Sequence, residues 1–242
     1  MLELSCALPA RSRRASCPPP PLAGLDLAAV SEPAETVSGD YYDFVQVKDG
    51  GLMLAVGDAS GHGLGPALIT AEVRACLRSL MRSDLDTARI LTSANDILIR
   101  SILENHFISL FLLCIQIEGR CISYASAGHP TGYVLDKDGQ IKARMLSTGF
   151  PIGIDPVAVM EPGPQVVLDD GDLVMLMTDG VLETRGSAKG LFGIDRLLEV
   201  VRDRQKQSSR CIVEAAIEAV RRFAAPTVPA DDMTLVVMKA VS

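Results

Sequence analysis

The chain has 242 residues, a mass of 25.8 kDa, a formal charge of -7 at neutral pH and a sequence pI near 5.0. Because a nucleic-acid-binding surface needs clustered lysine and arginine to neutralise phosphates, this acidic balance excludes nucleic acid as an expected partner. Hydrophobic residues make up 48% of the chain, but charges and glycines interrupt every apolar stretch before the roughly 18 residues that a membrane span requires, so no membrane association is expected.

The first 21 residues are expected to form a flexible N-terminal tail, because they end in a run of four prolines, Pro18 to Pro21. An acidic residue precedes the short apolar run at the N-terminus and arginines follow it, which is the reverse of a signal peptide, so we expect a cytoplasmic protein. Residues 22–242 are then expected to form one domain. The six cysteines contain no Cys-x-x-Cys pair, which favours free thiols over a zinc site.

Apolar periodicity divides the next part of the chain into three strands and two helices. The second and third strands flank the turn sequence Lys48-Asp49-Gly50-Gly51, so we expect them to form a hairpin. Pro66 suits the first turn of the first helix, and another face of that helix carries an arginine at every fourth position (Arg74, Arg78, Arg82), which is typical of a solvated surface. The five elements are expected over residues 25–30, 44–47, 52–56, 66–82 and 86–103.

The rest of the chain places short strands between turn residues and then adds two helices and a last strand. The short turns predict antiparallel neighbours. Runs such as Leu-Val-Met-Leu-Met do not alternate in polarity, which indicates strands covered on both faces. Helices in two adjacent pairs then favour an α+β fold, a four-layer α-β-β-α sandwich with two stacked, mainly antiparallel sheets. These later elements are expected over residues 109–117, 121–126, 132–135, 165–168, 173–177, 193–203, 209–223 and 233–239.

Four aspartates stand at the ends or starts of apolar, strand-like runs. Asp58 ends a buried strand and leads into a segment with three glycines, Gly61 to Gly65, which let backbone groups approach a ligand closely. Asp40 precedes it across the predicted hairpin, so the two side chains could share one edge. Asp179 also follows a buried strand, and Asp231 stands with Asp232 just before the last strand.

Carboxylates beside buried strands repel one another and lose hydration, so a positive group must hold them together. Four aspartates balance the charge of two divalent cations, and hard cations prefer oxygen ligands. Two such ions would clamp a phosphoryl group and lower the pKa of a water between them. Each Asp-Gly taken alone is typical of a turn, whereas the set of four in these contexts favours a two-metal hydrolase.

Five motifs occur in order within residues 22–241: Ser38-Gly39-Asp40-Tyr41-Tyr42-Asp43, Gly57-Asp58-Ala59-Ser60-Gly61-His62-Gly63, Ala127-Gly128-His129-Pro130, Thr178-Asp179-Gly180-Val181-Leu182-Glu183 and Asp231-Asp232-Met233-Thr234. With these motifs the chain resembles the SpoIIE-like branch of the PP2C (PPM) metal-dependent serine/threonine protein phosphatases. The resemblance implies an α-β-β-α sandwich that binds two Mn2+ or Mg2+ ions, in agreement with the layers expected above.

Carried over position by position, the resemblance implies that Asp58 bridges both metal ions. The Ala59 carbonyl and Asp40 would serve the second ion, and Asp179 and Asp231 would hold the first. Strand alternation lets only one of the two neighbouring aspartates before the last strand face the site. A metal-bridging hydroxide, held by Asp58, would then attack the phosphorus of phosphoserine or phosphothreonine in line, without a covalent intermediate. The implied substrate is a phosphorylated signalling protein, a STAS-type anti-sigma-factor antagonist, and the helices are a candidate homodimer surface.

The chain departs from the eukaryotic PP2C pattern at three places. Ser60 stands where that pattern has a histidine, a candidate general acid, and His62 two residues later is expected to organise the loop. His129 stands where some members offer an aspartate to a third metal, and we expect it to stabilise a hairpin. No counterpart of the phosphate-binding arginine is found, since the nearest arginines in sequence lie in the N-terminal tail.

Three other classes share features with this sequence. A haloacid-dehalogenase phosphatase needs a nucleophilic aspartate two residues before the Asp-Gly pair, where this chain has Met177. A receiver domain needs alternating strands and helices, which the chain lacks. The remaining alternative is a catalytically silent PP2C-like module that binds a partner in a signalling switch, because a fold does not guarantee an activity.

Overall fold

The computed structural model describes residues 22–47, 50–83, 86–100, 106–186, 190–227 and 229–241. The predicted N-terminal tail, residues 1–21, lies outside the described residues. The chain is divided into two compact units. The first unit consists of the segments Met1–Val37, Gly132–Arg144 and Asp169–Ser242, and the second consists of Ser38–Thr131 and Met145–Leu168.

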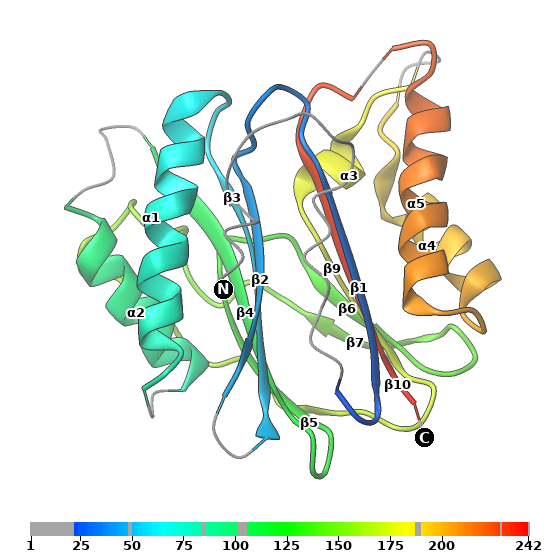
Figure 1. Cartoon of the computed structure of the whole chain (residues 1–242), viewed down its shortest axis with the longest axis horizontal. Helices are drawn as coiled ribbons and strands as arrows, with labels where there is room; N and C mark the ends of the chain where they lie inside the picture. The colour runs from blue at the N-terminus through cyan, green and yellow to red at the C-terminus, as the bar shows by residue number, and fades with distance from the viewer. Residues whose placement is uncertain are drawn as a thin grey trace, which may run out of the picture. The chain divides into compact units, whose positions relative to one another are not determined.

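The second unit contains a five-stranded sheet with two helices side by side on one face (Figure 1). The strand order is β2-β3-β4-β5-β8, and each pair of neighbours is antiparallel. The elements of this unit are β2 (Asp40–Gln46), β3 (Leu52–Ala59), α1 (Leu64–Leu80), α2 (Thr87–Leu98), β4 (Ile108–Gln116), β5 (Cys121–Ala127) and β8 (Val166–Val167).

Alternation along β3 directs every second side chain towards the two helices. Met53, Ala55 and Ala59 face this side, where they share a core with Val73 and Leu77 of α1. The side chains between them along β3 are buried as well: Leu52, Leu54 and Val56. The prediction that both faces of this strand are covered is therefore confirmed, and Asp58 belongs to the face directed away from the helices.

An ion pair with a buried carboxylate joins β2 to α1. The Asp43 side chain is 1% exposed and accepts hydrogen bonds from Arg78 Nε at 2.5 Å and Arg78 Nη2 at 2.8 Å, while Arg74 Nε lies 3.9 Å away. The Tyr41 hydroxyl donates to the same carboxylate at 3.2 Å, and burial together with the charge of Asp43 holds the pKa of Tyr41 well above its usual range. The expected solvated arginine face is therefore wrong for Arg74 and Arg78.

Replacing Arg78 by methionine should lower the free energy of unfolding by about 2 kcal/mol, because the buried Asp43 would lose the closer of its two arginine contacts and keep only the longer one, with Arg74. For a protein of this size the loss corresponds to a decrease in Tm of roughly 4–8 °C, measurable by circular dichroism. The exposed Arg82, one turn further along the chain, is a matched control, and Arg82→Met should shift Tm by less than about 2 °C. Equal shifts for the two variants would contradict a stabilising role of the ion pair.

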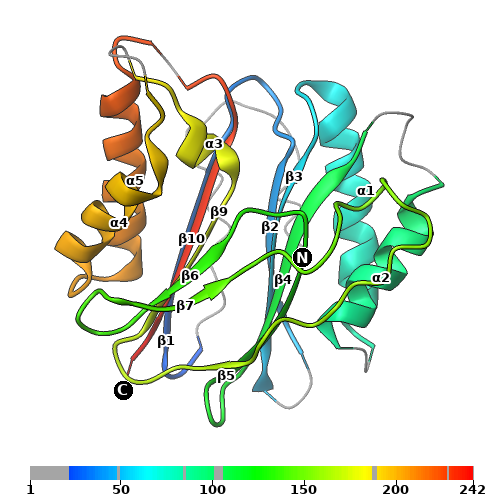
Figure 2. The same cartoon turned by 180° about the vertical axis from the view of Figure 1, so that it is seen from behind.

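The first unit has the same plan, a five-stranded sheet with a pair of helices on one face (Figure 2). The strand order is β1-β10-β9-β6-β7, and β1, β10, β9 and β6 pair in antiparallel fashion. The elements are β1 (Leu25–Glu32), β6 (Gly132–Leu135), β7 (Ile141–Met145), β9 (Leu173–Met177), α3 (Asp179–Glu183), α4 (Gly193–Arg204), α5 (Ser209–Ala224) and β10 (Met233–Ala240).

Helices α4 and α5 bury their apolar faces on the β1-β10-β9 part of this sheet. Met175 of β9 and Leu235 of β10 lie in one core with Leu197 of α4 and with Ile212 and Ile217 of α5. α5 begins after the N-cap residue Ser208, whose side chain accepts the Cys211 N–H. Antiparallel pairing and helices in adjacent pairs are thus confirmed, unit by unit.

The main differences from the sequence-based expectation concern β2, β7, α3 and the end of α2. β2 begins at Asp40, four residues before the expected start, β7 was not expected, and neither was the short helix α3. α2 ends at Leu98, whereas the pattern extended it to residue 103; the last three of those positions lie outside the described residues. The extension of β2 matters most, since it places Asp40 within the sheet.

Among the described helices, none combines the length and the hydropathy that crossing a membrane would require. The cysteines within the described residues, Cys76, Cys114, Cys121 and Cys211, are free, in agreement with the expected free thiols. Cys114 is buried and its pKa is raised by that burial.

Candidate functional site

Asp40 and Asp58 face each other across the β2–β3 hairpin. Their Cα atoms are partners in the antiparallel register, and the Ala59 N–H donates to the Gly39 carbonyl at 3.1 Å. This bond belongs to the neighbouring Gly39–Ala59 position, so Asp40 and Asp58 form a non-hydrogen-bonded pair. In such a pair the Cα atoms are about 4.5 Å apart and the side chains lie closest. Two like charges directly opposite each other are destabilising, so this pair favours a cation between the carboxylates.

The strand end that carries this pair is fixed from both sides. The Thr70 hydroxyl of α1 donates to the Gly39 carbonyl at 2.8 Å. A Cβ on Gly39 would lie 3.0 Å from the Ala59 carbonyl oxygen and 3.7 Å from Asp58 Oδ1. Both oxygens therefore lie next to Gly39, in the space that a side chain would occupy. The three oxygen donors that the sequence assigns to this unit, from Asp40, Asp58 and Ala59, are therefore brought together.

The segment after Asp58 has a backbone path that requires glycine. Gly61 and Gly63 have φ values of 91° and 87°, which side chains rarely tolerate. Ser60 fixes the start of the segment, since its N–H donates to the Phe107 carbonyl at 2.9 Å and its hydroxyl accepts the Phe107 N–H at 3.0 Å. Ser60 thus has a structural role here, and His62 is exposed on the loop that Ser60 anchors.

His129 lies two residues after the end of β5 and contacts β4, in agreement with the expectation that it stabilises a hairpin. It is 3% exposed, its Nδ1 lies 2.8 Å from Ser109 Oγ, and its ring meets Phe111 edge-on at 6.3 Å between centroids. Ser109 is the β4 register partner of Asp58. The imidazole therefore supports the strand next to Asp58.

In the first unit, Asp179 and Asp231 are brought together by a glycine. Asp179 is the first residue of α3, directly after β9. A side chain on the next residue, Gly180, would collide with the Asp232 carbonyl and would lie 3.3 Å from Asp231 Cβ. Only glycine lets the first turn of α3 lie this close to the segment before β10, so the two predicted ligands of this unit become neighbours.

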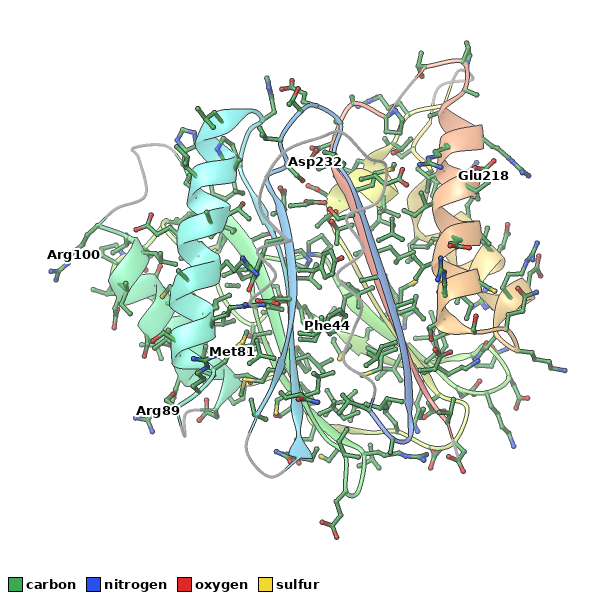
Figure 3. All side chains as sticks on the ribbon, in the orientation of Figure 1. Phe44, Met81, Arg89, Arg100, Glu218 and Asp232 are labelled. Carbon is green, nitrogen blue, oxygen red and sulfur yellow. The ribbon has the colours of Figure 1, made fainter. Side chains whose placement is uncertain are left out.

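Two threonines keep the end of β9 beside the start of β10. The Thr178 N–H donates to the Thr234 carbonyl at 3.0 Å, and the Thr234 N–H donates to Thr178 Oγ1 at 2.9 Å. No sequence motif indicated this exchange. Figure 3 shows Asp232 at the start of β10, close to α3.

The neighbouring aspartates 231 and 232 differ in their surroundings. Asp232 Oδ1 accepts the Ala34 N–H at 2.7 Å and so holds the segment that follows β1. Asp231 is exposed, and its Oδ1 accepts the Asp232 N–H at 2.9 Å. These contacts give Asp232 a structural role and agree with the choice of Asp231 as the ligand.

Burial raises the pKa of Asp179 above its usual range, and the nearby Glu183 carboxylate raises it further. Each unit thus holds two of the proposed acidic ligands, and every proposed donor is a hard oxygen, which fits Mg2+ or Mn2+. Within the described residues, no group of three or more His, Cys, Asp or Glu side chains is gathered closely enough to bind a metal ion by itself. The full ligand set stays a prediction.

The chain was compared with known families and proteins. The family model described as Stage II sporulation protein E (SpoIIE) matches residues 48–241. The chain belongs to the SpoIIE family. The phosphoserine phosphatase RsbU of Bacillus subtilis (strain 168) is 26% identical to this SpoIIE-family chain over 215 residues, which cover 89% of the chain and 63% of RsbU. The chain therefore spans less than two thirds of the length of this relative.

Solved structures show the fold of the SpoIIE-family chain. The SiaA-PP2C domain of Pseudomonas aeruginosa matches with a TM-score of 0.77 at 24% identity, over 88% of this chain and 85% of that one. RsbX, solved in complex with magnesium, matches with a TM-score of 0.66 at 16% identity, over 89% of this chain and 96% of that one. The chain has the PP2C fold, which confirms the predicted α+β class.

Proposed function

We propose that this chain is a metal-dependent phosphoprotein phosphatase that hydrolyses phosphoserine or phosphothreonine on a signalling protein. The observation that carries the proposal is the cross-strand pairing of Asp40 with Asp58, which places two like charges at closest approach. Membership of the SpoIIE family supports it, as does the similarity to RsbU, a phosphoserine phosphatase.

The proposed cofactors are two Mn2+ or Mg2+ ions. We assign Asp58 to both ions, Asp40 and the Ala59 carbonyl to one, and Asp179 and Asp231 to the other. When bound, such ions supply positive charge for a phosphoryl group and a water of lowered pKa. The contribution of the chain is to hold oxygen donors in fixed positions before the cations arrive, so that little reorganisation accompanies binding.

The contacts around Asp58 support this proposed order. Thr70 fixes the peptide before Asp40, and Ser60 fixes the peptide that follows the Ala59 carbonyl. The glycines that follow leave the loop without bulky side chains, which suits the approach of a phosphorylated peptide. Substrate would thus meet preformed backbone and carboxylate oxygens.

The substrate that we propose is a phosphorylated STAS-type anti-sigma-factor antagonist, which rests on the resemblance of the motifs. Structures of similar fold include the RsbU and RsbW domains of Rv1364c from Mycobacterium tuberculosis, and that similarity supports a role in signalling. The homodimer and the cytoplasmic localisation stay predictions.

Metal dependence tests the proposal. The purified chain should hydrolyse p-nitrophenyl phosphate and a phosphoserine protein when Mn2+ or Mg2+ is present, lose this activity in EDTA, and regain it when excess metal is restored. Released phosphate measures the rate. Activity that persists in EDTA would contradict the metal assignment. No activity with either metal, combined with tight binding of a phosphoprotein, would favour the silent partner-binding module instead.

A further inference from the structure

A small hairpin follows α3 in the first unit. The Phe192 N–H donates to the Thr184 carbonyl at 2.9 Å, the Gly186 N–H donates to the Gly190 carbonyl at 3.2 Å, and Arg185 pairs with Leu191 in antiparallel register. These bonds flank the Arg185–Leu191 position and make it a non-hydrogen-bonded pair, so the two side chains lie side by side on one face.

The two faces of this hairpin differ sharply in exposure. Thr184 and Phe192 point inward and are 6% and 3% exposed, whereas Arg185 is exposed and Leu191 is 43% exposed. Within the described residues, Arg185 forms no ion pair. A cationic and an apolar side chain therefore stand next to each other in solvent, although the chain as a whole is acidic.

The base of the hairpin is held rigidly. Arg196 Nη1 donates to the carbonyls of Leu191 at 3.0 Å and Phe192 at 2.9 Å, and its guanidinium lies 4.9 Å from the centroid of the Phe223 ring. The Phe192 and Phe223 rings pack edge to face at 5.5 Å. Arg196 is thus engaged in support of the hairpin, and Arg185 is the exposed cation among the hairpin residues that the structure describes.

The hairpin is tied to the Asp179–Asp231 pair. The Thr184 hydroxyl donates to the Gly180 carbonyl at 2.6 Å, and Gly180 packs against the backbone next to Asp231. Arg185 follows Thr184, the C-cap residue of α3, and lies six residues after Asp179 in the sequence. The hairpin thus begins where α3 ends, beside the Asp179–Asp231 pair, and a guanidinium there is placed to meet a residue that flanks a phosphorylated serine in a substrate.

We propose that Arg185 and Leu191 form a specificity element that binds the peptide segment flanking the phosphorylated residue. Arg185 binds an acidic side chain of that segment, and Leu191 contacts an adjacent apolar one. Arginine suits this task because its planar guanidinium pairs with a carboxylate through two hydrogen bonds. The inference rests on the proposed phosphatase function and adds to it a preference for acidic substrates.

Two phosphoserine peptides that differ only in flanking Glu or Gln residues test the preference. The unaltered chain should show a kcat/KM about tenfold higher for the Glu peptide, as expected for one charge-assisted hydrogen-bonded contact. Arg185→Gln should abolish the preference by raising KM for the Glu peptide, with kcat retained, and Arg185→Lys should restore part of it. The exposed Arg204 of α4 is the control, and Arg204→Gln should keep the full preference.

Two outcomes would overturn the proposal. In the first, the preference for the Glu peptide survives in Arg185→Gln. In the second, that variant loses activity equally towards both peptides and becomes less sensitive to inhibition by inorganic phosphate, which would place Arg185 on the phosphoryl group itself.

Leu191→Ser provides a second variant. It should weaken binding of a peptide with a flanking leucine several-fold and leave binding of the matching alanine peptide unchanged. Equal loss for both peptides would contradict the apolar contact.

Equilibrium binding separates this proposal from the proposed function. Fluorescence anisotropy with a labelled Glu phosphopeptide should give an affinity about tenfold weaker for Arg185→Gln than for the unaltered chain, with the difference shrinking at high salt. If this difference appears while no hydrolysis is found, the phosphatase function fails and the binding element stands. If hydrolysis depends on metal and neither KM nor affinity depends on Arg185, the binding element fails and the function stands.

Discussion

Asp58→Asn should lower kcat/KM for p-nitrophenyl phosphate by about a thousandfold, equivalent to about 4 kcal/mol of lost transition-state stabilisation. Asparagine keeps the shape of the side chain but removes its charge, and Asp58 is the residue assigned to both ions. A neutral amide oxygen is a weaker ligand for a hard cation than a carboxylate, so binding of Mn2+ should weaken together with the rate.

Stability without metal provides a second readout for the same variant. Asp58 faces Asp40 directly, so the asparagine removes a repulsion, and the metal-free variant should have a Tm equal to or higher than that of the unaltered chain. Titration calorimetry with Mn2+ and thermal unfolding in EDTA measure the two effects. Asp203→Asn, at an exposed position of α4, is the control. Activity that survives Asp58→Asn would refute the assignment, and a lower Tm would show that Asp58 serves the fold.

Most elements were predicted from periodicity because their apolar faces are continuous. β6 and β9 match their expected ranges fully, and α4 and α5 end one residue beyond theirs. The two missed elements differ in this respect. α3 has five residues, too few for a helical period, whereas the residues of β7, Ile141 to Met145, alternate between apolar and polar side chains, a strand signal that the sequence-based prediction overlooked.

The start of β2 was missed for a different reason. Aspartate is depleted in strands, so Asp40 and Asp43 interrupt the pattern on which the strand was recognised. Both have partners that only the fold reveals. Asp43 is neutralised by Arg78, 35 residues away, and Asp40 meets Asp58 through the hairpin register. The motifs identified the candidate acids, whereas the contacts that compensate or position them depend on tertiary packing.

The glycines at the candidate site were the hardest residues to interpret from sequence. The Asp-Gly pair at 179–180 is typical of a turn, and a turn would explain the glycine by backbone freedom. The structure gives a different reason, since Gly180 lies within α3 and needs its small size to pack against the segment before β10. The role of Gly180 is to let Asp179 and Asp231 lie close together.

Gly180→Ala should therefore destabilise the protein and weaken metal binding together. The added methyl group would collide with the Asp232 carbonyl, a backbone atom that cannot rotate away, so α3 must move from β10. Overpacking of this kind costs about 3 kcal/mol, or roughly 6–12 °C in Tm for a protein of this length. Because the shift separates Asp179 from Asp231, the affinity for Mn2+ should fall about tenfold or more.

Gly190→Ala is the matched control, because a Cβ at Gly190 would meet nothing within 4 Å. Its Tm and its Mn2+ affinity should stay close to those of the unaltered chain. Thermal unfolding in EDTA reports the packing effect alone, and calorimetric titration with Mn2+ at a temperature well below Tm reports the metal site. A Gly180→Ala variant with lowered Tm but full Mn2+ affinity would separate the two effects and remove Asp179 or Asp231 from the ligand set. Loss of both would tie the packing of α3 to the spacing of the two carboxylates.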